Sequence, residues 1–191
     1  MAVTGLEGGF ANPAMDSARV FRHVLGVMAR PGCIETVDTA APPLPLSAAA
    51  GAVLLTLADH DTPVHLAGDA DSKPVRDWLA FHTGASIIPP SQATFAVGSW
   101  ADLMPLAQYR TGTASYPDQS VTLIVEYPDL GEGGLAIRGP GIETTSRLAV
   151  PDADFFAFNA ARFPLGIDMI LTNGTRLAAV PRSTRLAEPE G

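Results

Sequence analysis

Cysteine, lysine and positive charge are scarce in this sequence. Its 191 residues include one cysteine, Cys33, and of its 12 basic residues one is lysine, Lys73, and the rest are arginine. A single cysteine cannot form an intrachain disulfide, which fits a reducing compartment. The 20 acidic residues give a net charge of −8. Because nucleic acids are bound by basic surfaces, we expect no nucleic-acid partner.

Long apolar segments are missing as well. The longest apolar run, residues 46–58, is too short to cross a bilayer. Residues 1–10 lack the basic and apolar regions of a secretory signal. With 47% hydrophobic and 17% charged residues, the composition is typical of a globular protein with a buried core. We expect a soluble cytoplasmic protein without a membrane partner, folded as one domain over residues 1–191 with loose termini at residues 1–12 and 186–191.

The C-terminal segment predicts a β-hairpin. Two apolar runs, residues 167–172 and 176–180, flank the dipeptide Asn173-Gly174. Asn-Gly is typical of the type I′ turn, in which both central residues have positive φ. Asp168 is a carboxylate at the entry to an apolar strand. We expect it to serve the fold rather than chemistry, bound to backbone N–H groups or to an arginine such as Arg182.

Helices and strands alternate along the first half of the chain, and strands dominate the second half. The first helix is expected to be capped by Asp16 or Ser17 and to bury a face that includes Phe21 and Leu25. A run rich in β-branched residues at 121–127 predicts an interior strand. This order of elements indicates an α/β fold, a mixed β-sheet with helices on both faces. The other helices are expected at residues 47–58, 72–83, 99–108 and 152–162, and the other strands at 33–37, 62–66, 93–97 and 135–138.

Lysine chemistry has one candidate. Pyridoxal phosphate forms its aldimine with a primary amine, so Lys73 is the residue that could anchor this cofactor. Lys73 has Asp69, Asp71 and Asp77 as neighbours in the sequence. A catalytic lysine needs surroundings that lower its pKa, whereas this segment is polar and acidic. We therefore interpret Lys73 as a solvated surface residue and expect no cofactor.

Two carboxylates flank a histidine in the segment Asp59-His60-Asp61. Such a group could bind a metal or act in acid–base chemistry. The alternative, which we favour, is a turn between a helix and a strand, with Asp61 leading into Thr62-Pro63. No pair of histidines has the spacing of a metal site, so no metal is expected.

A glycine-rich turn follows the strand at 135–138. Its backbone N–H groups could face a phosphate, but it lacks the length and the Lys-Ser/Thr ending of a P-loop, so a tight turn is favoured. His82 lies just before Gly84, which is expected to cap the C-terminus of a helix. No catalytic residue is identified. The candidate ligand-binding residues are Arg138, Gly139, Gly141, Asp59, Asp61, His82 and Arg182.

Several motifs occur together in one order along the chain. The string from 163 to 184 contains FPLGIDMIL and AVPRST, and residues 53–64 read VLLTLADHDTPV. Shorter motifs lie at 21–32, 81–85, 93–97, 112–114 and 139–142. By these motifs the chain resembles the H-subunit family of the bacterial carbon–phosphorus lyase system, over almost its whole length. The resemblance implies a fold similar to the large domain of pyridoxal-phosphate-dependent transferases, without their small domain.

The resemblance also implies a role within an assembly. Members of this family work with the G, I and J subunits in a core complex and are homodimers when alone. The complex displaces adenine from ATP with an alkylphosphonate, which gives ribose 1-phosphonate 5-triphosphate. The chain would then be a subunit without a complete active site of its own. Two alternatives stay open: a self-sufficient small transferase that binds a phosphorylated ligand, and a pure assembly scaffold.

Overall fold

A six-stranded mixed sheet forms the centre of the protein. The computed structural model describes residues 6–187. The strand order is β1-β8-β7-β4-β3-β2, in which β2, β3, β4 and β7 are parallel and β8 and β1 are antiparallel to their neighbours. The predicted mixed α/β sheet is therefore confirmed. The strands are β1 (Glu35–Thr36), β2 (Val64–Leu66), β3 (Phe95–Ser99), β4 (Thr122–Glu126), β7 (Asp168–Asn173) and β8 (Arg176–Val180).

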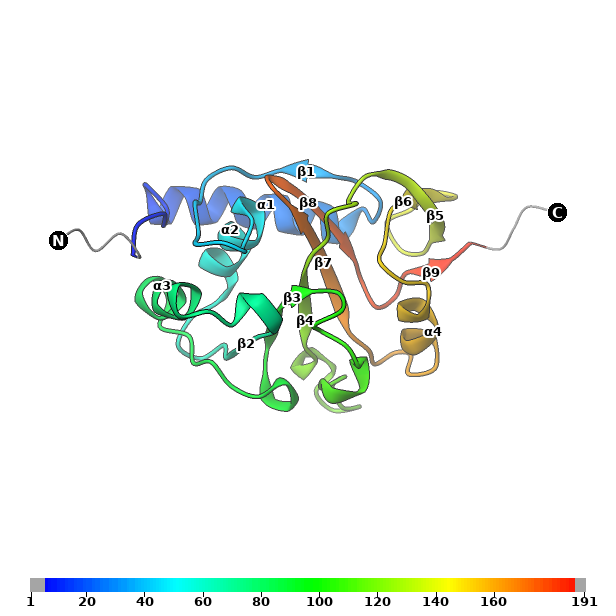
Figure 1. Cartoon of the computed structure of the whole chain (residues 1–191). Coiled ribbons are helices and arrows are strands. Elements are labelled where there is room, and N and C mark those ends of the chain that lie inside the picture. The colour runs from blue at the N-terminus through cyan, green and yellow to red at the C-terminus, as the bar shows by residue number, and fades with distance from the viewer. Residues whose placement is uncertain (1–5, 188–191) are drawn as a thin grey trace.

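Three helices cover one face of this sheet (Figure 1). They are α1 (Pro13–Ala29), α2 (Ala48–Leu57) and α3 (Lys73–Thr83). Helix α2 is built of small and apolar residues and is buried along its first two turns, as its composition predicts. Ser47 caps it through a hydrogen bond from Ala50 N–H to its Oγ (3.1 Å). Helix α3 ends at Gly84 in the left-handed conformation, also as predicted.

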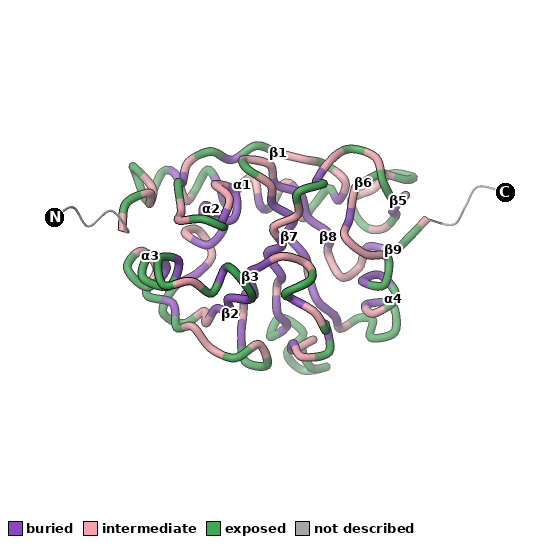
Figure 2. Tube along the Cα trace, in the orientation of Figure 1, coloured by how far each residue is buried: buried purple, intermediate pink, exposed green. Residues whose placement is uncertain are grey.

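The opposite face is covered by a helix and a second, smaller sheet. The helix is α4 (Asp154–Ala160), and the small sheet has the order β6-β5-β9, from β5 (Glu132–Arg138), β6 (Ser146–Leu148) and β9 (Arg185–Leu186). Two apolar cores result, one on each side of the central strands (Figure 2). Helices therefore lie on both faces, as predicted. The small sheet was not predicted as a separate layer.

Strand β4 lies in the interior of the central sheet, between β7 and β3. Its three middle residues, Leu123, Ile124 and Val125, are fully buried. They alternate between the two cores, with Ile124 in one and its neighbours in the other. The continuous apolar run arises because both faces of a two-sided strand need apolar side chains.

The start and the buried face of α1 differ from the prediction. The helix begins at Pro13 with Asn12 as its cap, whose Oδ1 accepts from Met15 N–H (3.3 Å). Proline fits the first helical position, where its missing N–H has no helical partner to lose. The buried residues of α1 include Val20, Val24 and Val27.

Two of the predicted core residues of α1 are exposed. Phe21 and Leu25 show 45% and 52% of their surface to solvent. The spacing of apolar residues was compatible with two adjacent stripes on the helix, and the narrower valine stripe is the one that meets the sheet. The prediction for Phe21 and Leu25 was therefore wrong.

The hairpin of β7 and β8 is confirmed, but its turn is of another class. Asn173 pairs with Arg176 across the ladder, so the loop consists of Gly174 and Thr175. Gly174 has a φ of 58°, and no non-glycine residue among those described has a positive φ. A positive φ at the first loop position alone is the pattern of a type II′ turn. Asn173 remains in the strand, and its side-chain N–H donates to the carbonyl of Pro128 (2.6 Å).

The helix predicted at 99–108 does not form. Ser99 Oγ donates to the carboxylate of Asp102 (2.6 Å) and accepts from Asp102 N–H (3.2 Å), as at the start of a helix. However, Pro105 follows three residues later, and a proline restricts the residue before it to extended backbone. The segment contains turns and a short 3₁₀ helix, Leu106–Gln108, in place of the α-helix.

The described ends of the chain are held in place. The carbonyls of Leu6 and Glu7 accept hydrogen bonds from His82 Nε2 (2.9 Å) and Trp78 Nε1 (3.1 Å) on α3. At the other end, β9 pairs with β5. Backbone groups at both described ends therefore have partners in the fold, and the expectation of loose termini at residues 1–12 and 186–191 stays a prediction. Residues 1–5 and 188–191 of the predicted termini lie outside the described part.

Candidate functional site

Asp168 and Arg182 form a partly buried ion pair at the end of the central hairpin. The carboxylate accepts from the backbone N–H of Arg182 (2.8 Å) and from its Nε (3.2 Å to each oxygen), and also contacts Nη2. The same guanidinium donates to the carbonyl of Pro117 (2.9 Å) and to Ser120 Oγ. The side chains are 15% and 18% exposed. The predicted pairing is confirmed. The guanidinium of Arg182 contacts Asp168 at the start of β7 and the segment 117–120 before β4.

A polar cleft lies beside this pair, at the amino ends of the parallel strands β2, β3 and β4. It encloses about 380 Å³. It is lined by Pro63 and Thr94, which directly precede β2 and β3, by Ser120, two residues before β4, and by Arg110. Asp61 lies on its exposed rim. Of the predicted ligand-binding residues, Asp61 lines this cleft. Arg182 contacts the cleft residue Ser120 through the hydrogen bond to its Oγ.

Asp59 belongs to a turn, as favoured from the sequence. Its Oδ1 accepts from Asp61 N–H and from Thr62 Oγ1, each at 2.9 Å. The hydrogen bond from the Thr62 hydroxyl is the main cause that holds the pKa of Asp59 below its ordinary value. His60 lies 3.2 Å from Asp61, and both side chains are about 80% exposed. Within residues 6–187, no three His, Cys, Asp or Glu side chains gather in a metal-binding arrangement.

The glycine-rich turn after β5 packs against the end of α1. A Cβ on Gly141 would overlap the carbonyl of Ala29, and one on Gly139 would lie 3.2 Å from the carbonyl of Ser183. Gly141 therefore permits close contact between two backbones. Arg138 is in the ladder of the small sheet, opposite Arg185. The structure does not bring these three candidates near the polar cleft residues or near His82.

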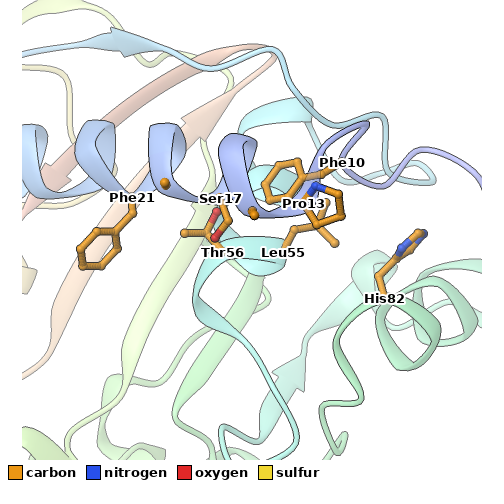
Figure 3. Close-up of a pocket in the computed structure, with 9 residues that line it drawn as sticks. Phe10, Pro13, Ser17, Phe21, Leu55, Thr56 and His82 are labelled. Atoms are coloured by element: carbon orange, nitrogen blue, oxygen red, sulfur yellow. The ribbon is translucent and has the colours of Figure 1, made fainter.

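His82 lines an apolar groove between helices (Figure 3). The groove encloses about 630 Å³, with Phe10 and the α1 residue Phe21 on one side, Leu55 and Thr56 of α2 at the base, and His82 of α3 opposite. Leu25 continues the stripe of Phe21 one turn further along α1. Phe81 is 64% exposed and makes a ring contact with His82. Contiguous exposed apolar surface of this kind is typical of an interaction site.

Glu126 is a carboxylate at the opposite, carboxyl end of the sheet. One of its oxygens accepts from Ser47 N–H at the start of α2 (2.7 Å). In the first turn of the same helix, Ala49 N–H donates to the carbonyl of Gly174 (2.9 Å). Burial raises the pKa of Glu126 above its ordinary 4.5. The residue closes the start of α2 against β4.

Arg110, Ser120, Glu126 and the groove residue Phe21 were missed as site residues from the sequence. Glu126 carried a signal, since it is a charged residue that ends an apolar strand. Arg110 and Ser120 carried no such signal, because they lie at the two ends of a loop of small and polar residues. Lys73 forms an exposed pair with Asp77 (2.6 Å), in agreement with its interpretation as a surface residue. No helix in the described part of the chain is long and apolar enough to span a membrane.

The comparisons with known proteins agree with one another. Residues 8–187 match the family model described as "Bacterial phosphonate metabolism protein (PhnH)". A curated relative from Rhizobium meliloti (strain 1021), alpha-D-ribose 1-methylphosphonate 5-triphosphate synthase subunit PhnH, is 44% identical over 192 residues, which cover 94% of each chain. Another relative, from Stutzerimonas stutzeri, is the protein HtxG, which is named as a candidate C–P lyase subunit. It is 35% identical over 83 residues, 40% of this chain and 43% of its own.

Replacing Asp168 by alanine should destabilise the protein strongly. The change leaves the guanidinium of Arg182 partly buried without its carboxylate, so we expect the free energy of unfolding to fall by about 3–5 kcal/mol. Urea denaturation measures it. Asp77→Ala is the matched control, because it removes an exposed pair and should cost less than about 1 kcal/mol. An Asp168→Ala protein that unfolds like the wild type but loses its biological activity would assign Asp168 to function instead.

Replacing Glu126 by glutamine should remove a pH-dependent loss of stability. Since burial raises the folded-state pKa of Glu126, this group favours the folded state at low pH, and the benefit is lost as pH rises through the folded pKa. Glutamine keeps an oxygen that can accept from Ser47 N–H. We expect the stability of Glu126→Gln relative to wild type to improve between pH 4 and pH 7 in parallel urea titrations. A difference that stays constant over this range would contradict the assignment.

Proposed function

Because the chain belongs to the PhnH family of bacterial phosphonate metabolism proteins, we propose that it is a subunit of an α-D-ribose 1-methylphosphonate 5-triphosphate synthase. The observation that carries this proposal is 44% identity over 94% of both chains to a relative with that name. The match covers 94% of both chains, so it includes the surface residues through which a subunit contacts its partners as well as the core. It therefore favours the same role in an assembly. The chain would serve the use of organic phosphonates as a phosphorus source.

In the proposed reaction, a phosphonate oxygen bonds to the ribose carbon of ATP that carries adenine, and adenine leaves. The product is a ribose 1-phosphonate 5-triphosphate. We propose that this chain supports the reaction as a non-self-sufficient subunit, together with the G, I and J subunits of a carbon–phosphorus lyase core complex. It would work without pyridoxal phosphate, since the chain has a single lysine, Lys73, and that residue lies in an exposed ion pair.

The finer structural expectations belong to the same proposal. We propose a single domain over residues 1–191, related to the large domain of pyridoxal-phosphate-dependent transferases. The two cores on either side of one continuous sheet support this, because neither would be closed without the central strands. A cytoplasmic location and a homodimer in the absence of partners complete the proposal, and a single cysteine is compatible with the former.

We further assign the apolar groove of α1, α2 and α3 to contact with another subunit of the complex. The exposed ring of Phe21 lines it, and Arg22 is exposed beside Phe21 on α1. Phe81 lies outside the lining, but its exposed ring contacts that of the groove residue His82. A concave surface needs a convex partner. In a two-fold contact centred on the groove, a second copy of this chain would present the same concave surface, so it would not fill the groove. The occupant that fits is an apolar helix of a different subunit, with acidic residues that face Arg22.

Deletion of the gene should abolish growth on an alkylphosphonate as sole phosphorus source, while growth on phosphate continues. The purified chain alone should not release adenine from ATP in the presence of methylphosphonate, whereas the chain with the other subunits should. Adenine release by chromatography measures this. Phosphonate-dependent adenine release by the chain alone would overturn the subunit proposal in favour of a self-sufficient transferase.

The groove assignment predicts that Phe21→Asp prevents assembly. A carboxylate at this place would have to be desolvated in an apolar contact, so recovery of the other subunits with a tagged chain should fall about tenfold or more. Phe163→Asp is the matched control, because Phe163 is also exposed (60%) but stacks on Arg185 at a distance from the groove. If Phe21→Asp retained the subunits and instead dissociated a homodimer in light scattering, the groove would be a contact between copies.

A further inference from the structure

The polar cleft before β2, β3 and β4 combines an arginine that has no carboxylate partner within residues 6–187 with several hydrogen-bond donors. Arg110 lines the cleft and is half-buried. One of its five N–H donors is used, by Nη2 to the carbonyl of Ala93 (3.2 Å). Its Nε is buried and, among the described residues, has no hydrogen-bond partner. Buried donors almost always have an acceptor in native proteins, so this arginine is incompletely satisfied by the described residues.

The hydroxyl of Ser120 adds a second donor. Its Oγ accepts from the guanidinium of Arg182 at the back of the cleft, which leaves its own O–H free to donate forward. Thr94 contributes another hydroxyl, and Gln92 and Gln119 contribute side-chain amides at the rim. These groups come from the segments before β3 and β4, which the sheet holds side by side.

The acidic residues of the cleft are placed differently from its arginine. Asp61 and Asp118 are exposed and lie on the rim, whereas Arg110 and Ser120 lie deeper. Solvent screens the charges of the rim more than it screens a half-buried guanidinium. A compact anion can therefore reach the donors at the base, while the rim carboxylates accept hydrogen bonds from N–H or O–H groups attached to it.

We propose that this cleft binds a small tetrahedral oxyanion, a phosphate or phosphonate group, through Arg110, Ser120 and Thr94. Arginine and hydroxyl donors suit such oxygens, and a space of about 380 Å³ accepts the group with a short organic substituent. The site follows from the geometry of the chain itself and does not depend on the proposed function. If the chain is a synthase subunit, this site would take the phosphonate substrate or free phosphate.

The test is titration of the isotope-labelled full chain with inorganic phosphate and with methylphosphonate, at constant ionic strength. We expect saturable shifts of the backbone amide signals of residues 92–94, 110 and 118–120. In Arg110→Gln the affinity should fall about tenfold or more, the loss typical of a charge-assisted contact. Arg147→Gln, which removes an exposed arginine of β6, should bind like the wild type.

A second variant guards against misfolding of Arg110→Gln. Thr94→Val keeps the shape of the side chain and removes one donor, so it should weaken binding while the rest of the spectrum is unchanged. The ligand with the higher affinity identifies the source of the group, phosphonate or phosphate. Shifts that do not saturate, that lie outside the cleft or that persist unchanged in both cleft variants would overturn the proposal. Growth on phosphonate tests the subunit role separately, because it needs no binding by the isolated chain.

Discussion

The ion pair of Asp168 with Arg182 is the interaction on which the second half of the structure depends. Asp168 begins β7, and Arg182 follows β8, so the pair closes the open end of the central hairpin. The same guanidinium reaches the segment before β4 through Pro117 and Ser120. Three segments are thus fixed relative to one another by one side chain. Such a pair is strongly unfavourable to break, because each partner would be left partly buried and uncompensated.

The segment that leads into β7 is fixed by a second polar contact. Asn159 of α4 is buried, and its side-chain amide donates to the carbonyl of Ile167 (3.0 Å) and accepts from its N–H (2.9 Å). The side-chain amide of Asn159 therefore satisfies both backbone groups of Ile167, as a neighbouring strand in a sheet would. Together with the ion pair at Asp168, it sets where β7 starts, and β7 in turn carries β4 and β8 at its two sides.

The surfaces left by this scaffold have distinct chemistry. The groove of α1, α2 and α3 is lined mostly by apolar residues and includes the exposed ring of Phe21. The cleft around Arg110 is polar, and its residues are held by the amino ends of parallel strands. Ligands of open α/β sheets usually bind at the carboxyl ends. Here Glu126, the start of α2 and the hairpin turn occupy part of that edge with hydrogen bonds of their own.

The sequence by itself determined the local features. Turn chemistry placed the hairpin, small residues placed α2, and the unbroken run before Glu126 placed β4 inside the sheet. Because Asp168 is a carboxylate at the entry to an apolar strand, the sequence also predicted that it binds backbone N–H groups or an arginine such as Arg182, and it does both. These features depend on residues close in the chain, where propensity and spacing are sufficient.

Only the tertiary structure decided which apolar stripe of α1 is buried and which residues share a cavity. Phe21 and Val24 have the same hydrophobic character, and the position of the sheet selects between them. Arg110 and Thr94 are 16 positions apart. They line one cleft because Val121 N–H, just before β4, donates to the carbonyl of Arg110, and β4 pairs with β3. Such proximity depends on strand order and on contacts between distant segments. The spacing of apolar residues along the sequence does not encode either of them.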